Sequence, residues 1–178
     1  SGEEQAVMLT LDIFKETVEE LPSDESMKRS VTHALESAAV NSREPCELAL
    51  RIVDAHEMRT LNGRYRGRDY ATNVLSFPAD LPEEVSLNLL GDLVVCAPVV
   101  RDEASAQGKP LAAHWDHMLV HGTLHLLGYD HETDREAEHM ESLETRILAA
   151  LGWPCPYEGR HQSTPLAAAQ QQAGVTAR

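Results

Sequence analysis

The sequence predicts an α+β (mixed α/β) fold in one domain, and three observations support that prediction. Four short segments show the two-residue alternation or the bounded apolar runs that are typical of strands. Other segments place apolar residues three and four positions apart, as amphipathic helices do. The chain has 178 residues, of which 42% are hydrophobic, and this is enough for one buried core without disulfides.

Each element follows from a local pattern. Alternation and apolar runs predict strands at residues 7–13, 46–52, 73–77 and 90–96. Capping and start signals predict helices that begin near Ser23, Asp54, Pro98, Pro110 and Thr133. We expect the second helix to bury Met58, Leu61 and Tyr65. At its start, Asp54 and Glu57 resemble a capping box.

The domain is expected to span residues 8–157. Residues 158–178 are rich in Gln, Ala and Thr without an apolar period, so we expect a disordered tail. Residues 1–7 are interpreted as an N-terminal extension or a remnant of cloning. Three widely spaced cysteines without a CxxC pair favour a reducing cytoplasm over a disulfide framework. The sequence contains no apolar span of 18 residues, so no membrane segment is expected.

The net charge of −14 argues against a general nucleic-acid binder, which is normally basic. The charge is unevenly distributed, however. Five of the fifteen Lys and Arg residues lie in one short stretch: Arg51, Arg59, Arg64, Arg66 and Arg68. Two interpretations stay open for this stretch, a locally basic cleft and ordinary solvated helix faces.

Histidines are concentrated in one part of the chain, since five of the nine fall between His114 and His131. His121 and His125 are four residues apart and therefore share one face of a helix. Gly128 is placed where a helix commonly ends in the left-handed conformation, and the turn after it can return His131 to the other two. Three converging imidazoles predict a metal site with one position open, as in catalytic rather than structural zinc sites.

The spacing of this stretch also matches the metzincin protease pattern H-E-x-x-H-x-x-G-x-x-H, with one departure. Gly122 stands where those proteases have the glutamate that acts as general base. Either the base comes from elsewhere, or the reaction is not peptide hydrolysis. His114 and His117 lie on about the same helix face. They can support a metal ligand, contact substrate or pack in the core, and the last is favoured.

The stretch from His121 to His131 is similar to the signature of the YbeY family of bacterial zinc-dependent single-strand endoribonucleases. Further blocks resemble this family in the same order, at residues 61–62, 65–67, 69, 72–78, 90–94, 108–110 and 114–118. The resemblance covers about residues 8–157. It implies a zincin-like domain with a mixed sheet of about four strands. It also implies a role in ribosomal RNA maturation at the 16S 3′ end and in ribosome quality control.

The resemblance implies particular residues. One Zn²⁺ ion is expected on His121, His125 and His131, and Arg66 falls on a functionally required arginine of the family. His121 and Arg66 are thus the candidate catalytic residues. The expected partners are single-stranded RNA, the small ribosomal subunit and ribosome-associated proteins, in the cytoplasm.

A mechanism follows as a hypothesis. The metal binds the scissile phosphate, and the planar guanidinium of Arg66 neutralises the developing charge. Four residues are candidate substrate contacts: Arg64, Arg68, Tyr65 and His117. Two alternatives stay open. One is a metalloprotease with metzincin spacing, and the other is a non-catalytic ribosome-assembly factor with a structural zinc.

Overall fold

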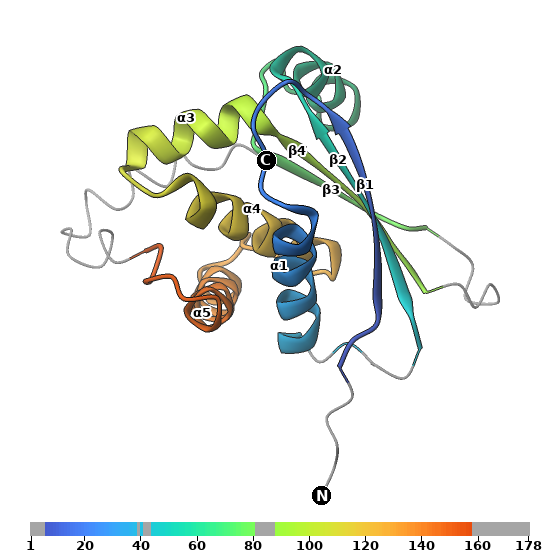
Figure 1. Ribbon diagram of the computed structural model, residues 1–178, viewed down its shortest axis with the longest axis vertical. Coiled ribbons are helices and arrows are strands. Elements are labelled where there is room, and N and C mark those ends of the chain that lie inside the picture. Colours follow the sequence, from blue (N-terminus) through green and yellow to red (C-terminus); the bar gives the residue numbers. More distant parts are fainter. Residues whose placement is uncertain (1–5, 39, 41–43, 81–87, 158–178) are drawn as a thin grey trace, which may run out of the picture.

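Four strands form one mixed sheet, which confirms the predicted fold class (Figure 1). The computed structural model describes residues 6–38, 40, 44–80 and 88–157. The strands are β1 (Leu9–Glu16), β2 (Cys46–Val53), β3 (Val74–Pro78) and β4 (Leu89–Cys96), in the spatial order β1-β2-β4-β3. β1, β2 and β4 are parallel, whereas β3 is antiparallel to β4. The predicted tail at residues 158–178 lies outside the described residues, as do residues 1–5 of the predicted extension.

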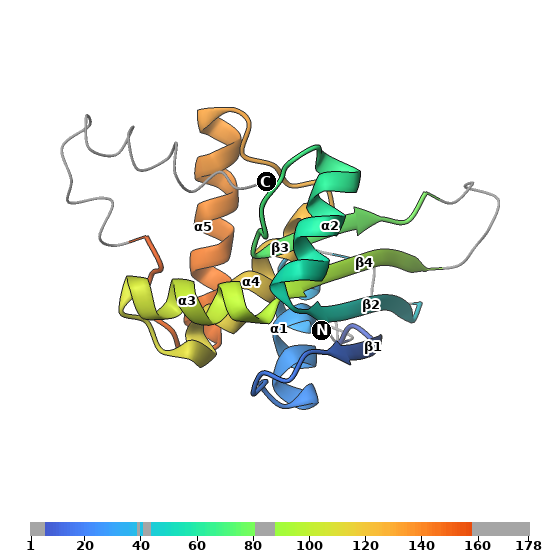
Figure 2. The same cartoon turned by 90° about the horizontal axis from the view of Figure 1, so that it is seen from above.

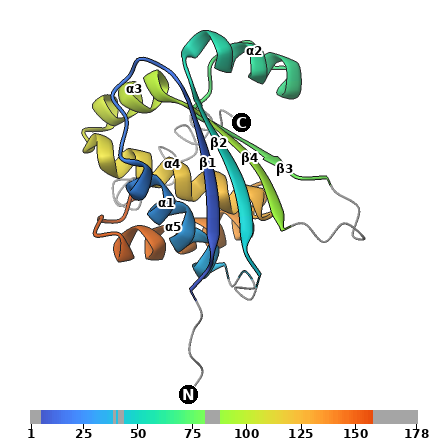
Figure 3. The same cartoon turned by 45° about the vertical axis from the view of Figure 1, so that its right-hand side comes forward.

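The helices are distributed unequally over the two faces of the sheet. Their bounds are α1 (Asp24–Ser37), α2 (Ala55–Arg66), α3 (Ala97–Gln107), α4 (Leu111–Leu126) and α5 (Asp134–Ala150). Figure 3 shows α1, α4 and α5 on one side of the sheet, with α2 at one end of the strands. Strand residues of the opposite face, among them Val53 and Val94, pack with Met58 of α2. Among the described residues, no helix is long and apolar enough to cross a membrane.

Helix α4 is the central element because it is covered from two sides (Figure 2). On the sheet side, Trp115 and Leu119 pack in one cluster with strand residues such as Leu50 and Leu93. On the other side, Val120 and Leu124 pack against α5 in a second cluster. Most residues of α4 are consequently buried. Trp115 and Met118 are both buried in the core.

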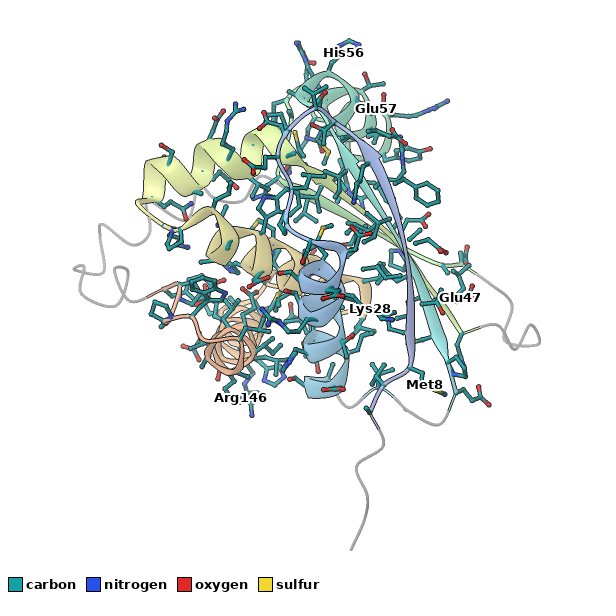
Figure 4. All side chains as sticks on the ribbon, in the orientation of Figure 1. Met8, Lys28, Glu47, His56, Glu57 and Arg146 are labelled. Carbon is teal, nitrogen blue, oxygen red and sulfur yellow. The ribbon has the colours of Figure 1, made fainter. Side chains whose placement is uncertain are left out.

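Most charged side chains lie around this core, with the buried carboxylates of Asp116 and Glu144 as exceptions among the described residues. Figure 4 labels Lys28 on α1, Glu47 on β2 and Arg146 on α5, all of which are exposed. His56 and Glu57 are labelled at the first turn of α2, where the acidic side chain is favoured by the positive end of the helix dipole. Charged residues are thus found on the solvent side of several elements, although Phe14 on β1 and Leu111 on α4 are also exposed.

Two local predictions about α2 are wrong. Tyr65 was expected to be buried, but 53% of it is exposed and its ring contacts Phe77 edge-on. Asp54 is the N-cap residue but makes no side-chain capping bond. Its carboxylate instead accepts a hydrogen bond of 2.5 Å from Thr17 Oγ1, a residue 37 positions earlier. In contrast, the cap predicted at Thr133 is present, since Thr133 Oγ1 accepts from the Glu136 N–H.

The close approach of α4 to the sheet depends on Gly122. A Cβ at this position would lie 2.9 Å from Val74 Cγ2 and 3.2 Å from Leu93 Cδ2. Both neighbours are buried, and a β-branched valine has little freedom to move away. Ser76 Oγ donates a 2.8 Å hydrogen bond to the Gly122 carbonyl at the same contact. The glycine that departs from the protease pattern is therefore required by packing.

Replacement of Gly122 by alanine is expected to destabilise the protein. Overpacking costs about 1–3 kcal/mol, which outweighs the gain of about 1 kcal/mol in helix propensity. The matched control is Gly63→Ala in α2, where the new Cβ meets only the Arg68 carbonyl at 3.5 Å. That variant should gain about 0.5–1 kcal/mol. Urea unfolding measures both free energies, and equal stabilisation by the two substitutions would contradict the packing argument.

Candidate metal centre

The end of α4 and the turn after it bring three imidazoles together. His121 and His125 lie one turn apart, and Gly128 then adopts a φ of 97° that ends the helix. One ring nitrogen from each of His121, His125 and His131 lies within 4.8 Å of the others. The Nε2 atoms of His121 and His125 are 3.0 Å apart, so both point to one place. The predicted convergence of the three histidines is confirmed.

The donor set of this group fits a divalent metal ion. Neutral imidazole is a good ligand for Zn²⁺ and for several neighbouring transition metals. Within the described residues, the group contains three potential ligands, and all three are only partly buried. The group is therefore partly accessible from outside the protein. Asp130, which follows Gly128 and Tyr129 in the turn, accepts a 2.7 Å hydrogen bond from the backbone N–H of His131 and so stabilises the turn.

Glu144 contacts a candidate metal ligand and was not identified from the sequence. It lies on α5, is only 1% exposed and faces α4. Its Oε1 lies 2.9 Å from His121 Nδ1, which leaves Nε2 of that ring free to face the other histidines. A signal was present in the sequence. Glu144 lies on the same helix face as Met140, Leu143 and Ile147, and a carboxylate on an apolar stripe requires a buried partner.

The electrostatics of the centre follow from burial and from this carboxylate. Burial alone would lower the pKa of His121, but the charge and hydrogen bond of Glu144 raise it above the ordinary value. Burial would raise the pKa of Glu144, but His121 and His117 hold it well below its usual range. Burial, together with His121 and His131, lowers the pKa of His125 to about 4. His125 is therefore neutral, as a ligand must be, across the physiological range.

The other two histidines of α4 are buried. His114 is 2% exposed, and its Nε2 lies 3.0 Å from Glu103 Oε1. His117 is 7% exposed, and its Nε2 lies 2.8 Å from Glu144 Oε2 and 3.2 Å from Tyr157 Oη. Burial lowers the pKa of His117. The structure therefore favours a core role for both, and substrate contact by His117 stays a prediction.

Arg66 is linked through β3 to α4, the helix that carries His121 and His125. Its guanidinium donates a 3.0 Å hydrogen bond to the Ser76 carbonyl and lies 5.2 Å from the centre of the Phe77 ring. The Ser76 hydroxyl in turn donates to the carbonyl of Gly122, which is the neighbour of His121 in α4. β3 thus connects the predicted arginine to the helix that holds two of the histidines.

The arginine-rich stretch separates into two groups. Arg51 pairs with Glu16 and Glu57, and Arg59 makes a two-bond pair with Asp69. Among the described residues, Arg64, Arg66 and Arg68 make no ion pair with a carboxylate. Arg64 lies over the Tyr65 ring, 5.9 Å from its centre. Only the second group has guanidinium charge available for an anionic ligand.

Fold and site together define a mixed α/β protein with an open three-histidine centre on its central helix. The family model described as "Endoribonuclease YbeY" matches residues 12–152. The chain therefore belongs to the endoribonuclease YbeY family, which confirms the family inferred from the sequence. Endoribonucleases are hydrolases, so family membership confirms the predicted enzyme class.

Individual relatives support this assignment. A protein from Cellvibrio japonicus named Endoribonuclease YbeY is 58% identical over 140 residues, which cover 79% of this chain and 77% of the relative. A protein of the same name from Pseudomonas putida is 54% identical over 151 residues, covering 84% and 94%. The solution structure of TM1509 from Thermotoga maritima matches the fold with a TM-score of 0.52 at 22% identity, over 88% of this chain and 98% of that one.

Metal binding at the three histidines is expected to depend on pH. A proton on His121 must leave before its ring binds a metal, and the pKa of His121 lies above its ordinary value of about 6.5. Zn²⁺ affinity should therefore rise as pH increases through and above that value and level off once His121 is neutral. Calorimetric titrations between pH 5.5 and 8.5 measure this. An affinity that is constant across the range would contradict the raised pKa.

Proposed function

We propose that this protein is a single-strand-specific endoribonuclease that hydrolyses phosphodiester bonds at a Zn²⁺ site formed by His121, His125 and His131. One observation supports this proposal most directly. In a chain of the YbeY family, three ring nitrogens converge within 4.8 Å of one another at the end of the central helix. An open site of this kind suits catalysis better than a closed structural site.

The three histidines and Glu144 have different roles in this proposal. His121, His125 and His131 would hold the Zn²⁺ ion, which would supply Lewis acidity for the hydrolysis of a phosphodiester. His125 is neutral at physiological pH because its pKa is about 4, and Glu144 holds the His121 ring by Nδ1. Because neutral imidazoles carry no charge, a bound ion would retain its full charge of +2.

Arg66 is proposed to bind the scissile phosphate. Its planar fork matches two phosphate oxygens, and negative charge increases on those oxygens in the transition state. Its present hydrogen bonds are to backbone carbonyls, of Ser76 at 3.0 Å and Tyr65 at 3.3 Å. A phosphate is a stronger acceptor than a carbonyl for a charged guanidinium. The hydrogen bonds from Arg66 to Ser76 and from Ser76 to Gly122 on α4 support this proposal.

We propose that the C-terminal end of α2, which carries Arg66, also contacts the rest of the substrate. The half-exposed ring of Tyr65 can stack on an unpaired base, and Arg64 and Arg68 can follow the phosphate backbone. Stacking of this kind requires a base that is not already paired, which favours single strands. We further propose, from the family resemblance, ribosomal RNA of the small subunit as substrate and the cytoplasm as location, with ribosome-associated proteins as partners.

The two alternative functions have less support. A metalloprotease of metzincin type needs a glutamate at position 122, where even a Cβ would lie 2.9 Å from Val74. A non-catalytic assembly factor with a structural zinc would be favoured by a fourth protein ligand. The potential metal group within the described residues has three members.

His121→Ala is expected to abolish metal-dependent RNA cleavage. The variant loses one of three ligands, so its activity should fall to that of wild-type protein in excess chelator. The assay compares single- and double-stranded RNA oligomers and determines the end groups of the products. The control is His56→Ala on α2, an exposed histidine outside the group. Full cleavage by His121→Ala at verified zero metal content would refute the zinc role.

Arg66→Lys is expected to lower kcat by roughly a hundredfold, because an ammonium keeps the charge but loses the two-bond contact with phosphate. The matched control is Arg59→Lys on the same helix, where the arginine already pairs with Asp69. That variant should keep nearly all of its activity. Single-turnover cleavage of a single-stranded oligomer measures both, and equal losses would show that α2 stability rather than phosphate binding is affected.

A further inference from the structure

The segment after α5 runs back to α4. Its last described residue, Tyr157, contacts Glu144, the residue that binds His121. Tyr157 is 7% exposed, and its hydroxyl donates a 2.5 Å hydrogen bond to Glu144 Oε2. Its ring packs edge-on against His117, with centroids 5.6 Å apart. Tyr157 therefore contacts the carboxylate that holds His121, although it lies on a different segment from every metal ligand.

Both oxygens of Glu144 have assigned partners. Oε1 lies 2.9 Å from His121 Nδ1, while Oε2 receives Tyr157 Oη at 2.5 Å and His117 Nε2 at 2.8 Å. Two donors on one oxygen fix the rotation of the carboxylate, which one donor alone does not. The carboxylate contacts Nδ1 of His121, so the Nε2 atom of that ring faces His125.

Tyr157 also contacts the ring of His117. His117 Nε2 lies 3.2 Å from Tyr157 Oη, so a proton on Nε2 is shared between the carboxylate and the phenol oxygen. The Nδ1 atom of His117 has no partner among the described residues. Without the phenol, the ring loses one of the two contacts that favour a proton on Nε2 rather than Nδ1. A proton on Nδ1 would leave two lone pairs facing each other at 2.8 Å.

The position of Tyr157 is set by contacts that do not involve the metal ligands. Gly152 ends α5 with a φ of 92°, and the Trp153 N–H donates to the Leu148 carbonyl. Trp153 Nε1 donates a 2.6 Å hydrogen bond to Asp116 Oδ2 on α4. The other oxygen of Asp116 accepts from Ser30 on α1. The segment is thus attached to α4 independently of the three histidines.

We infer that Tyr157 is a positioning residue for the metal centre, which acts through Glu144 on the imidazole of His121. The inference rests on the proposed metal site and goes beyond it. A purely structural role of Tyr157 would come from its aromatic ring, whereas positioning depends on its hydroxyl. Tyr157→Phe separates the two because it keeps the ring and removes only the hydroxyl.

The test measures Zn²⁺ affinity by competition with a chromophoric chelator and the visible spectrum of the Co²⁺-loaded protein. Tyr157→Phe should lower Zn²⁺ affinity by roughly tenfold, the lower end for residues that support a ligand, and should change the Co²⁺ ligand-field bands. Tyr129→Phe is the control, because that tyrosine stacks on His139 near the same turn. The control should match wild type in both measurements.

A double variant that combines Tyr157→Phe with Glu144→Gln shows whether the loss of Zn²⁺ affinity passes through Glu144. If it does, the double variant binds Zn²⁺ about as weakly as Glu144→Gln alone. Additive losses would overturn the inference, as would wild-type affinity and spectrum in Tyr157→Phe. Near-UV circular dichroism checks that each apo variant is folded.

If Tyr157→Phe does not fold, Trp153→Phe weakens the attachment of the same segment away from Glu144. It should lower Zn²⁺ affinity severalfold, and unchanged affinity would overturn the inference. None of these measurements uses RNA. A wild-type protein that binds Zn²⁺ at these histidines but does not cleave RNA would overturn the proposed function alone.

Discussion

The candidate metal centre depends on the hydrogen bonds of a buried carboxylate, Glu144, which lies between α5 and α4. Glu144 is 1% exposed, and burial of an unpaired charge would cost several kcal/mol. His121, His117 and Tyr157 each form a hydrogen bond with it, so its charge is compensated from α4 and from the segment after α5. The same bonds orient the ring of His121. The hydrogen bonds that compensate the buried charge of Glu144 are thus the same ones that contact the candidate metal ligand His121.

A second constraint is the contact between α4 and the sheet. Gly122 allows the helix to approach β3 and β4, and the Ser76 hydroxyl bonds its carbonyl. The neighbouring Ser76 carbonyl accepts from Arg66. One side of α4 thus presents histidines to α5, and the other side is joined to the strand that contacts the arginine. A side chain at position 122 would meet Val74 and Leu93, which leaves no room for the glutamate of the protease pattern.

Much of the fold could be predicted because its signals are local. Strand alternation, helical spacing, the cap at Thr133 and the turn at Gly128 depend on residues close in sequence, and the structure has each of them. The errors are long-range. The side chain of Asp54 bonds Thr17 instead of a backbone N–H of α2, and the exposed ring of Tyr65 contacts Phe77 of β3. Neither partner is visible from a window of neighbouring residues.

The sequence by itself determined the three histidines, because helix periodicity and one glycine fix their convergence over eleven residues. It also determined the family, whose model matches residues 12–152. Only the tertiary structure decided which side chains surround the three histidines. Glu144 and Tyr157 lie 23 and 36 residues beyond His121 and reach it through the packing of α5 and the segment after it on α4. Such contacts depend on how whole elements pack, and no local pattern specifies that.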